Sequence, residues 1–254
     1  MSLALGLDCG SAYCKGALVS TTGELLALTF RQTGWDFSRT GEEILTELRP
    51  RAATEYIPVV ATGYGRARIT GVVATPTEIG CHARGAARLR PGVGTVVDIG
   101  GQDTKVITVD KRGRAKSFQM NNKCAAGTGR FLDLALNRLG VNFSKLDTFL
   151  TDNLQIRLNS LCVVFAESEI TGLLAEGRSR EEILGGVVTS LADKTTALAA
   201  RIDLQPPVIL TGGLAESQGI AKALSRALGL EVQPTTHGFY AGAIGAAETA
   251  LHGI

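Results

Sequence analysis

A short segment near the N-terminus recurs in the middle of the chain, and this repeat constrains the fold more than any other feature. Residues 7–19 (LDCGSAYCKGALV) are echoed by residues 97–109 (VDIGGQDTKVITV). The matched positions are Asp8 with Asp98, Gly10 with Gly100, Lys15 with Lys105, and the later turn glycines Gly23 with Gly113. Each copy has the pattern of strand, glycine-rich turn, strand, turn and strand. Two copies of one hairpin predict two similar lobes that face each other across a cleft.

The segments outside the repeat carry helix and strand signals. Residues 40–48 predict a helix with acidic residues in its first turn, and residues 131–139 keep one apolar helical face before a glycine. Residues 179–182 form a capping box that opens a long helix. A buried strand, a Gly-Gly turn and a capped helix are expected from residue 207 onward, and a small-residue helix from residue 240.

These patterns indicate an α/β protein in which two related lobes enclose a cleft. We expect residues 1–90 to form the first lobe and residues 91–238 the second, with a C-terminal helix in residues 239–254 packing back on the first. A chain of 254 residues is long enough to bury a core of this size.

Composition and charge exclude several classes of protein. A net charge of +2 gives no reason to expect a nucleic-acid or anionic-membrane partner. No apolar run has membrane-spanning length, and the N-terminus lacks the pattern of a signal peptide. Five cysteines in such a chain indicate free or metal-bound thiols in a reducing compartment. We therefore expect a cytoplasmic protein.

The two Asp-x-Gly turns are chemically suited to phosphate groups. Glycine lets backbone N–H groups approach an anion closely, whereas an aspartate must act through Mg²⁺ or water. Asp8 is the better candidate to organise Mg²⁺, and Asp98 the better candidate to orient an attacking water. Alone, an Asp-x-Gly turn is also a common structural turn. Two in register, followed by the Thr-Gly-Gly turn that ends at Gly213, favour a nucleotide site.

Four further residues of these motifs have two possible roles each. Lys15 and Lys105 could contact phosphates or carboxylates, or they could be exposed strand lysines. Gly212 and Gly213 would let an adenosine lie flat on the backbone, or they could form an ordinary strand-to-helix turn.

Two cysteines, Cys124 and Cys162, each come just before a segment with a helical pattern. A thiolate at a helix start is stabilised by the positive end of the helix dipole, which makes it a better metal ligand. Buried thiols are the alternative for both. No Cys-x-x-Cys occurs, so a cluster built within one chain is not expected.

Three motifs resemble the phosphate-1, phosphate-2 and adenosine motifs of the actin, Hsp70 and acetate-kinase superfamily. They are Asp8-x-Gly10-Ser11, residues 98–103 (DIGGQD) and residues 210–214 (LTGGL). The resemblance implies duplicated ribonuclease-H-like lobes around a nucleotide cleft. It also implies nucleotide contacts from Gly10, Ser11, Lys15, Gly100, Gly101, Gln102, Asp103, Gly212 and Gly213, with Asp8 and Asp98 as catalytic residues.

More narrowly, residues 98–105 (DIGGQDTK), 122–132 (NKCAAGTGRFL) and 162–169 (CVVFAESE) resemble the BadF/BadG/BcrA/BcrD ATPase family. This family includes activators of 2-hydroxyacyl-CoA dehydratases and reductases of double-cubane-cluster proteins. The resemblance implies ATP or ADP, Mg²⁺ and one [4Fe–4S] cluster shared by a homodimer, with Cys124 and Cys162 of each chain as ligands. It further implies a ferredoxin or flavodoxin as electron donor and an iron–sulfur dehydratase or reductase as acceptor.

The first phosphate loop departs from the family pattern, because Ala12 and Tyr13 stand where hydroxyl-bearing residues are common. Cys9 alternates with apolar residues on one strand face and is expected to be a buried small apolar residue, and Cys14 and Cys81 are interpreted in the same way. The three histidines, His82, His237 and His252, are too scattered to predict a metal site.

The motifs leave three classes of function open. The first is an ATP-driven electron-transfer activator. The second is a small-molecule kinase of the same superfamily, in which Asp98 would be the general base toward a substrate hydroxyl. The third is a nucleotide-regulated binding or assembly protein without redox chemistry. The paired cysteines favour the first.

Overall fold

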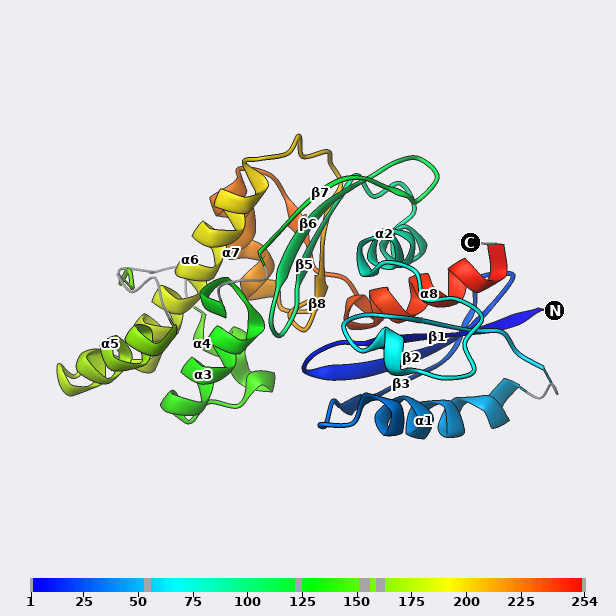
Figure 1. The fold of residues 1–254 in the computed structure, drawn as a ribbon. Coiled ribbons are helices and arrows are strands. Elements are labelled where there is room, and N and C mark those ends of the chain that lie inside the picture. Colours follow the sequence, from blue (N-terminus) through cyan, green and yellow to red (C-terminus); the bar gives the residue numbers. More distant parts are fainter. Residues whose placement is uncertain (1, 53–55, 122–124, 151–155, 159–162, 253–254) are drawn as a thin grey trace.

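The computed structural model describes residues 2–52, 56–121, 125–150, 156–158 and 163–252. In these residues the chain forms one 4-stranded and one 5-stranded sheet, with helices between and around them (Figure 1). None of the helices in the described part of the chain combines the length and apolar character needed to cross a bilayer.

The first sheet contains β1 (Leu3–Cys9), β2 (Tyr13–Ser20), β3 (Leu25–Gln32) and β4 (Val59–Thr62) in the order β3-β2-β1-β4. The first three strands pair antiparallel, and β4 runs parallel to β1. Helix α1 (Phe37–Leu48) packs against β1, β2 and β3 and covers one face of the sheet (Figure 1).

The second sheet repeats this arrangement and adds a strand. It contains β5 (Thr95–Ile99), β6 (Thr104–Val109), β7 (Ala115–Asn121), β8 (Val208–Gly212) and β9 (Val232–Gln233) in the order β7-β6-β5-β8-β9. The strands β5, β6 and β7 pair antiparallel, and β8 runs parallel to both β5 and β9.

The predicted repeat is confirmed in three dimensions. Asp8 pairs with Lys15 across the first hairpin, and Asp98 pairs with Lys105 across the second. The register between the second and third strands also shifts near the end of the second strand in both copies. The sequence match therefore corresponds to a structural match, down to the same irregularity.

Helices on the outer face of the second sheet build the largest apolar core. They are α3 (Gly129–Leu139), α4 (Leu146–Phe149), α5 (Val163–Ala175), α6 (Arg180–Ala199) and α7 (Gln218–Leu228). Helix α6 contacts β6 and β7, while α3, α4 and α7 pack against α6. Short 3₁₀ turns occur at Arg49–Ala52, Arg66–Arg68, Ala125–Gly127, Phe143–Lys145 and Gly238–Tyr240.

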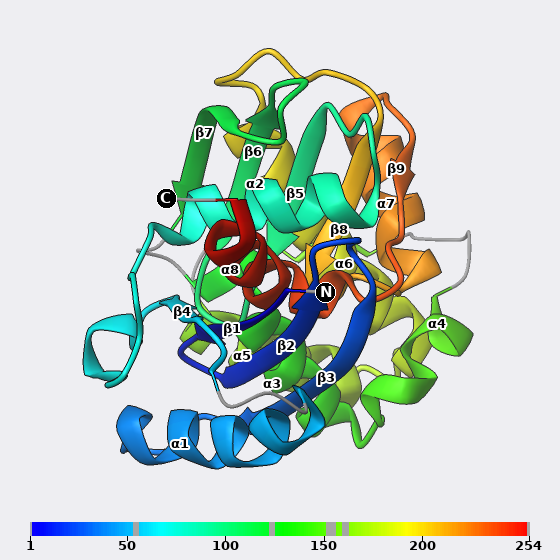
Figure 2. The same cartoon turned by 90° about the vertical axis from the view of Figure 1, so that its right-hand side faces the viewer.

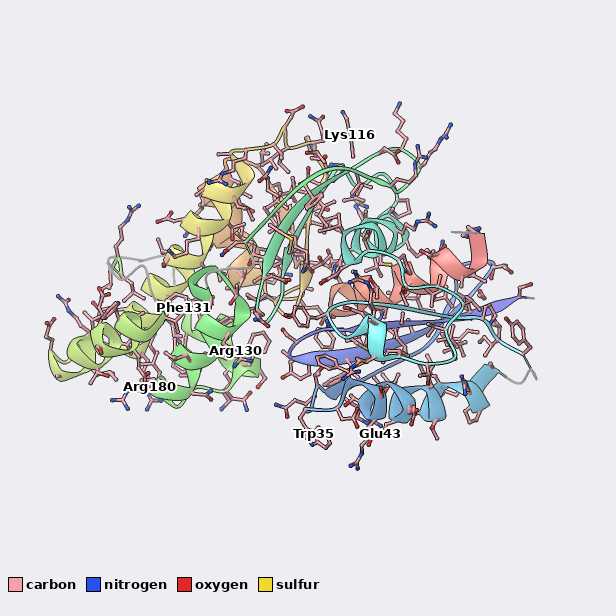
Figure 3. The ribbon with its side chains drawn as sticks, in the orientation of Figure 1. Trp35, Glu43, Lys116, Arg130, Phe131 and Arg180 are labelled. Carbon is pink, nitrogen blue, oxygen red and sulfur yellow. The ribbon has the colours of Figure 1, made fainter. Side chains whose placement is uncertain are left out.

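Two of the predicted helix signals are confirmed in this region. The apolar face predicted in residues 131–139 is buried along α3, and Gly140 ends the helix in the left-handed conformation with φ 61°. Phe131 is buried and its neighbour Arg130 is exposed (Figure 3). The capping box is also formed, because Ser179 accepts from the Glu182 amide and Glu182 accepts from the Ser179 amide.

The predicted start of α1 was wrong. The helix begins at Phe37, and no acidic residue lies in its first turn. The side chain of Asp36 accepts a hydrogen bond from the Arg39 amide at 3.2 Å, so Asp36 is the N-cap. Because Asp36 caps the helix, α1 begins more than one turn before the acidic pair Glu42 and Glu43, which lies in its middle.

Helices α2 (Glu78–Leu89) and α8 (Ala241–His252) lie between the two sheets (Figure 2). Helix α8 packs on β1, β2 and β4, while α2 contacts β5, β6, β7 and α8. The two helices approach closely because glycines face each other. A Cβ at Gly85 would lie 1.8 Å from the Ala241 oxygen, and one at Gly245 would lie 1.8 Å from the Cys81 oxygen. The lobe boundaries at residues 90 and 238 stay predictions.

Candidate functional site

The residues highlighted by the sequence motifs line one cavity of about 520 Å³. They lie on β1, β2, β5, β6 and β8 or directly after β1, β5 and β8, so both sheets contribute. The lining includes Asp8, Gly10, Ser11, Lys15, Asp98, Gly100, Gly101, Gln102, Asp103, Gly212 and Gly213. A cavity of this volume is suited to a small-molecule ligand. All residues predicted to contact nucleotide or to act in catalysis are thus brought together.

The two glycine turns have the same hydrogen bonding and meet each other. The Gly10 amide donates to the Tyr13 carbonyl at 3.0 Å, and the Gly100 amide donates to the Asp103 carbonyl at 2.9 Å. A Cβ placed on Gly101 would lie 2.8 Å from the Cβ of Ala12. The small residue at position 12 is therefore explained by the contact between the two loops.

Tyr13 belongs to an aromatic group at the rim of the cavity. Its ring packs edge-on against Phe30 and Phe239, with centroids 5.7 Å apart in each case. The Nζ atom of Lys15 lies 5.0 Å from the centre of the Phe239 ring, within cation–π range. The aromatic residue in this loop thus has a packing role that a small hydroxyl-bearing residue could not fill.

Each hairpin presents a lysine to its own aspartate. Lys15 Nζ lies 3.1 Å from Asp8 Oδ2, and Lys105 Nζ lies 3.2 Å from Asp98 Oδ2. Lys105 is 1% exposed and also lies 2.6 Å from Asp103 Oδ1. Of the two roles that the sequence left open for these lysines, contact with carboxylates is observed, and neither is an exposed strand lysine.

Asp98 is held ionised by its neighbours. Burial would raise the pKa of the Asp98 carboxyl, but His82 and Lys105 beside it hold that pKa well below its usual range. Thr211 Oγ1 donates to Asp98 Oδ1 at 2.9 Å and lowers the pKa further. Burial acts on Asp8 in the same way, and Lys15 and its other cationic neighbours outweigh it, so the pKa of Asp8 is also lowered.

Two residues of the site, Glu78 and His82, come from α2 and were missed in the sequence. His82 is buried, with Nδ1 3.2 Å from Asp98 Oδ1 and Nε2 3.9 Å from Asp8 Oδ2. Glu78 lies one turn earlier, with Oε1 2.8 Å from Lys105 Nζ. The i, i+4 spacing of Glu78 and His82 places them on one helix face, and this was the available signal. The scatter of the three histidines in the sequence gave no reason to expect a metal site, yet His82 lies in a group with Asp8 and Glu78 that could hold a metal ion.

The residues at the cavity floor have the chemistry of a divalent-cation site. Asp8, Glu78 and His82 each offer a ligand atom, and these atoms lie within 4.8 Å of one another. The Oδ1 atom of Asp8 is buried and accepts no hydrogen bond from any described residue. A buried carboxylate oxygen without a partner suits a cation or its bound water, so the carboxylates of Asp8 and Glu78 fit Mg²⁺, which prefers oxygen ligands.

The two glycines of the Thr-Gly-Gly turn, Gly212 and Gly213, differ in their surroundings. Gly212 has φ +85°, and a Cβ there would lie 2.3 Å from the Ile99 oxygen. At Gly213 a Cβ would meet nothing nearer than that oxygen at 3.9 Å. The packing of the protein therefore explains Gly212, whereas Gly213 leaves room beside the cavity that it lines.

The cysteines predicted as cluster ligands, Cys124 and Cys162, lie outside the described residues. Helices α3 and α5 follow them in the chain and begin at Gly129 and Val163. The expectation for the other three cysteines is confirmed, since Cys9, Cys14 and Cys81 are free and buried. Burial raises the pKa of Cys81 to about 11, which makes it a poor metal ligand.

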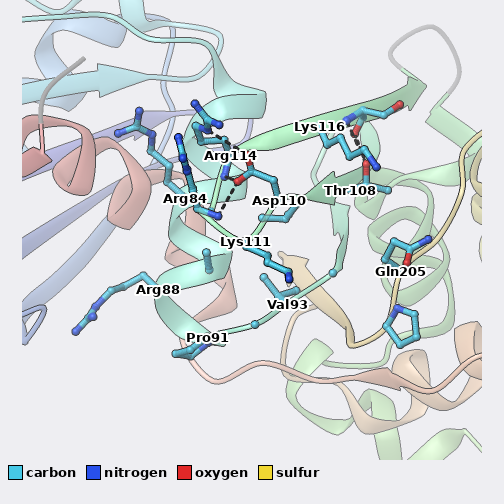
Figure 4. A pocket seen from close by; sticks show the side chains of 18 of the residues that line it. Arg84, Arg88, Pro91, Val93, Thr108, Asp110, Lys111, Arg114, Lys116 and Gln205 are labelled. Carbon is cyan, nitrogen blue, oxygen red and sulfur yellow. Dashed lines mark hydrogen bonds and ion pairs between the residues drawn. The ribbon is translucent and has the colours of Figure 1, made fainter.

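A larger hollow of about 1450 Å³ lies elsewhere, between the end of α2, the β6–β7 hairpin and the loop before β8 (Figure 4). Its lining is rich in basic side chains, among them Arg84, Arg88, Lys111 and Arg114. None of the residues predicted to contact nucleotide or to act in catalysis lines it. The smaller cavity, where both hairpins meet, is therefore the candidate site.

Two hairpin-based sheets, joined by crossing helices around a cavity lined by paired aspartates and lysines, define the actin-like class of α/β fold. The solved structure of the ethanolamine utilization protein EutJ from Carboxydothermus hydrogenoformans has this fold, with a TM-score of 0.64 at 20% identity. That match covers 100% of this chain and 90% of the other.

The chain belongs to the BadF/BadG/BcrA/BcrD ATPase family, whose pattern matches residues 5–250. It is 38% identical over 248 residues to the (R)-2-hydroxyglutaryl-CoA dehydratase activating ATPase of Acidaminococcus fermentans, covering 96% of this chain and 95% of the relative. It is also similar to the ADPNP-bound activator of the 2-hydroxyisocaproyl-CoA dehydratase from Clostridium difficile. That structure has a TM-score of 0.90 at 37% identity, covering 98% of this chain and 94% of the other.

Proposed function

We propose that this protein is an ATP-hydrolysing activator that couples nucleotide turnover to low-potential electron transfer toward a partner dehydratase or reductase. The observation that carries the proposal is the cavity lined by two Asp–Lys pairs from equivalent hairpins, in a chain of this ATPase family. The similarity to a dehydratase activating ATPase and to a dehydratase activator with bound ADPNP supports ATP use and activation of a dehydratase.

ATP is proposed to lie between the two glycine turns. The backbone amides of Gly10, Ser11, Gly100 and Gly101 would bind the phosphates, and the adenosine would rest on Gly213. Asp98 would accept a hydrogen bond from the attacking water and orient it toward the γ-phosphorus. Because its pKa is held low, Asp98 is a weak base, which supports orientation rather than removal of a substrate proton.

The divalent ion that accompanies ATP would be organised by the carboxylate of Asp8, with Glu78 and His82 nearby. Bound Mg²⁺ supplies charge neutralisation for the β- and γ-phosphates. Lys15 keeps one oxygen of Asp8 occupied, so the unpartnered Oδ1 is the atom available to the ion or to its water shell.

Electron transfer is proposed to use one [4Fe–4S] cluster shared by a homodimer. Cys124 and Cys162 of each chain would supply its four thiolates, and a cluster of this type passes single electrons. A ferredoxin or flavodoxin would donate the electron, and an iron–sulfur dehydratase component or double-cubane protein would accept it.

Anaerobic purification and an ATPase assay test this proposal. The protein should be brown and should hydrolyse ATP slowly in the presence of Mg²⁺. Asp98→Asn should bind ADP as the wild type does but hydrolyse ATP about 100-fold more slowly, the typical effect of a misplaced reacting group. A colourless protein that phosphorylates a small-molecule hydroxyl would contradict the proposal and identify a kinase.

A further inference from the structure

One buried histidine lies between Asp8 and Asp98, the two aspartates proposed to act in catalysis, but belongs to neither hairpin. His82 comes from α2, the helix that contacts the second sheet and packs against α8. Its side chain is 4% exposed. Nδ1 lies 3.2 Å from Asp98 Oδ1, and Nε2, on the opposite edge of the ring, lies 3.7 Å from Glu78 Oε1 and 3.9 Å from Asp8 Oδ2.

The contacts of Asp98 show what His82 adds. Thr211 Oγ1 donates to Asp98 Oδ1 at 2.9 Å, and Lys105 Nζ lies 3.2 Å from Oδ2. Thr211 and Lys105 belong to strands β8 and β6, which flank the strand of Asp98 in the same sheet. His82 Nδ1 lies 3.2 Å from Asp98 Oδ1 as an ion-pair contact without hydrogen-bond geometry, and it is the contact from a separate element, α2.

Helix α8 confines the imidazole on its other side. A Cβ at Gly242 would lie 3.0 Å from His82 Nε2 and 2.6 Å from Asp8 Oδ2. The backbone of α8 therefore lies directly beside the histidine and the first aspartate. This close approach leaves little room for the imidazole ring to move. The position of the ring is therefore fixed by the positions of α2 and α8.

We infer that His82 is a positioning residue that holds Asp98 in line for hydrolysis by linking it, through α2, to the half of the site that contains Asp8. The inference rests on the proposed ATP hydrolysis. A five-membered ring with nitrogens on opposite edges can reach one carboxylate from each sheet at once. An amide side chain can replace one of these nitrogens but not both.

Two substitutions separate the two edges of the ring. His82→Asn keeps a nitrogen near the Nδ1 position that faces Asp98, and His82→Gln keeps one near the Nε2 position that faces Asp8. Both remove the imidazole, so their comparison isolates the position of the remaining nitrogen. We expect His82→Gln to lower the kcat of ATP hydrolysis by about 10- to 100-fold. We expect His82→Asn to retain most of the activity, with KM and the Kd for ADP nearly unchanged in both.

Cys81→Ala is the matched control, because it alters the neighbouring buried residue of α2 and leaves both aspartates and their ion pairs in place. It should leave kcat within about threefold of wild type. Equal hydrolysis by His82→Gln and wild type would overturn the inference. So would equal losses in both variants together with weaker ADP binding, because that pattern describes a merely structural residue.

A thermal-unfolding cycle tests the contact without relying on hydrolysis. His82→Gln, Asp98→Asn and the double variant are compared by their Tm values. Coupling between His82 and Asp98 should make the Tm shift of the double variant differ from the sum of the two single shifts. Additive Tm shifts would overturn the inference. A wild-type protein that neither binds nor hydrolyses ATP would count against the proposed function. If the wild type hydrolyses ATP and His82→Gln hydrolyses it at the same rate, that result would count against this inference alone.

Discussion

Lys15 and Lys105 show how single residues at matched positions can differ in burial while they share a role. Each neutralises the aspartate opposite it, but Lys105 also lies beside Asp103 and Glu78. Burial would lower the pKa of Lys105, but these three carboxylates raise it well above its usual range. More charged groups therefore gather around the lysine of the second hairpin than around that of the first.

The stability of the protein should fall in acid because of its buried aspartates. The pKa values of Asp8 and Asp98 are lowered in the folded state from 3.8, so the unfolded chain binds their protons first as the pH falls. Their contribution is complete well above pH 3.8 and is lost progressively below it, as the pH approaches the folded-state values. Urea denaturation between about pH 6 and 2 measures this loss.

The control for this experiment is an exposed aspartate. Asp98→Asn should flatten the acid dependence, whereas Asp193→Asn, at an exposed position of α6, should leave it unchanged. An acid profile that is identical in all three proteins would show that the Asp98 ion pairs do not contribute to stability.

Gly213→Val should weaken nucleotide binding and leave the fold intact. A side chain there meets no close protein atom, so it would extend into space beside the cavity. We expect the Kd for ADP, measured by calorimetry, to rise at least tenfold, which corresponds to about 1.4 kcal/mol. Gly34→Val is the matched control, because Gly34 is exposed and a Cβ there would have no atom within 4 Å. Wild-type affinity in Gly213→Val would show that this turn is only structural.

At the scale of elements, the crossing of α2 and α8 determines how the site is assembled. Small residues at the crossing let the two backbones come close. This places His82 beside Asp98 of one sheet and Asp8 of the other, with Glu78 near His82 and Asp8. The hairpins supply the loops and the aspartates, while the crossing helices bring the halves of the site together.

Gly245→Ala should therefore destabilise the protein, because its methyl group would clash with the Cys81 carbonyl. We expect a loss of roughly 1–3 kcal/mol in the free energy of unfolding, typical of overpacking. Gly172→Ala in α5 is the matched control, since nothing lies within 4 Å of the added carbon. That change should be neutral or stabilising, by up to about 1 kcal/mol. Equal effects in denaturant melts would show that the crossing is not tightly packed.

At the scale of the whole molecule, the proposed cluster belongs to two chains. A cubane needs four thiolates, and the family resemblance assigns two cysteines per chain to it. Cys124→Ser and Cys162→Ser should each abolish bound iron, and wild type should contain about four irons per dimer. Cys81→Ser should retain the iron, because Cys81 is a buried residue of α2 and is not one of the two proposed ligands. Iron analysis combined with light scattering measures both quantities.

A brown monomer, or full iron content after loss of either cysteine, would contradict the shared cluster. ATP hydrolysis that persists in the cluster-free variants would be compatible with the proposal, because the nucleotide cavity is lined by other residues.

The local features of this protein could be predicted from the sequence because they depend on residues close together in the chain. The two hairpins, the apolar face of α3 and the capping box at Ser179 are all of this kind. The motif residues of the cavity were also identified, since each lies at the end of a strand or within a glycine turn. The start of α1 was missed because one capping side chain decided it.

Only the tertiary structure placed Glu78 and His82 in the site. Their positions depend on the close packing of α2 against α8, two helices far apart in the sequence, and on how both lie between the sheets. Contacts between distant segments also decide which glycines are required, since a Cβ at Gly212 would meet the Ile99 oxygen of β5, whereas one at Gly213 would meet nothing nearer than 3.9 Å. Local patterns determine which elements form, whereas contacts between distant elements determine which side chains meet, because burial and charge pairing depend on the whole fold.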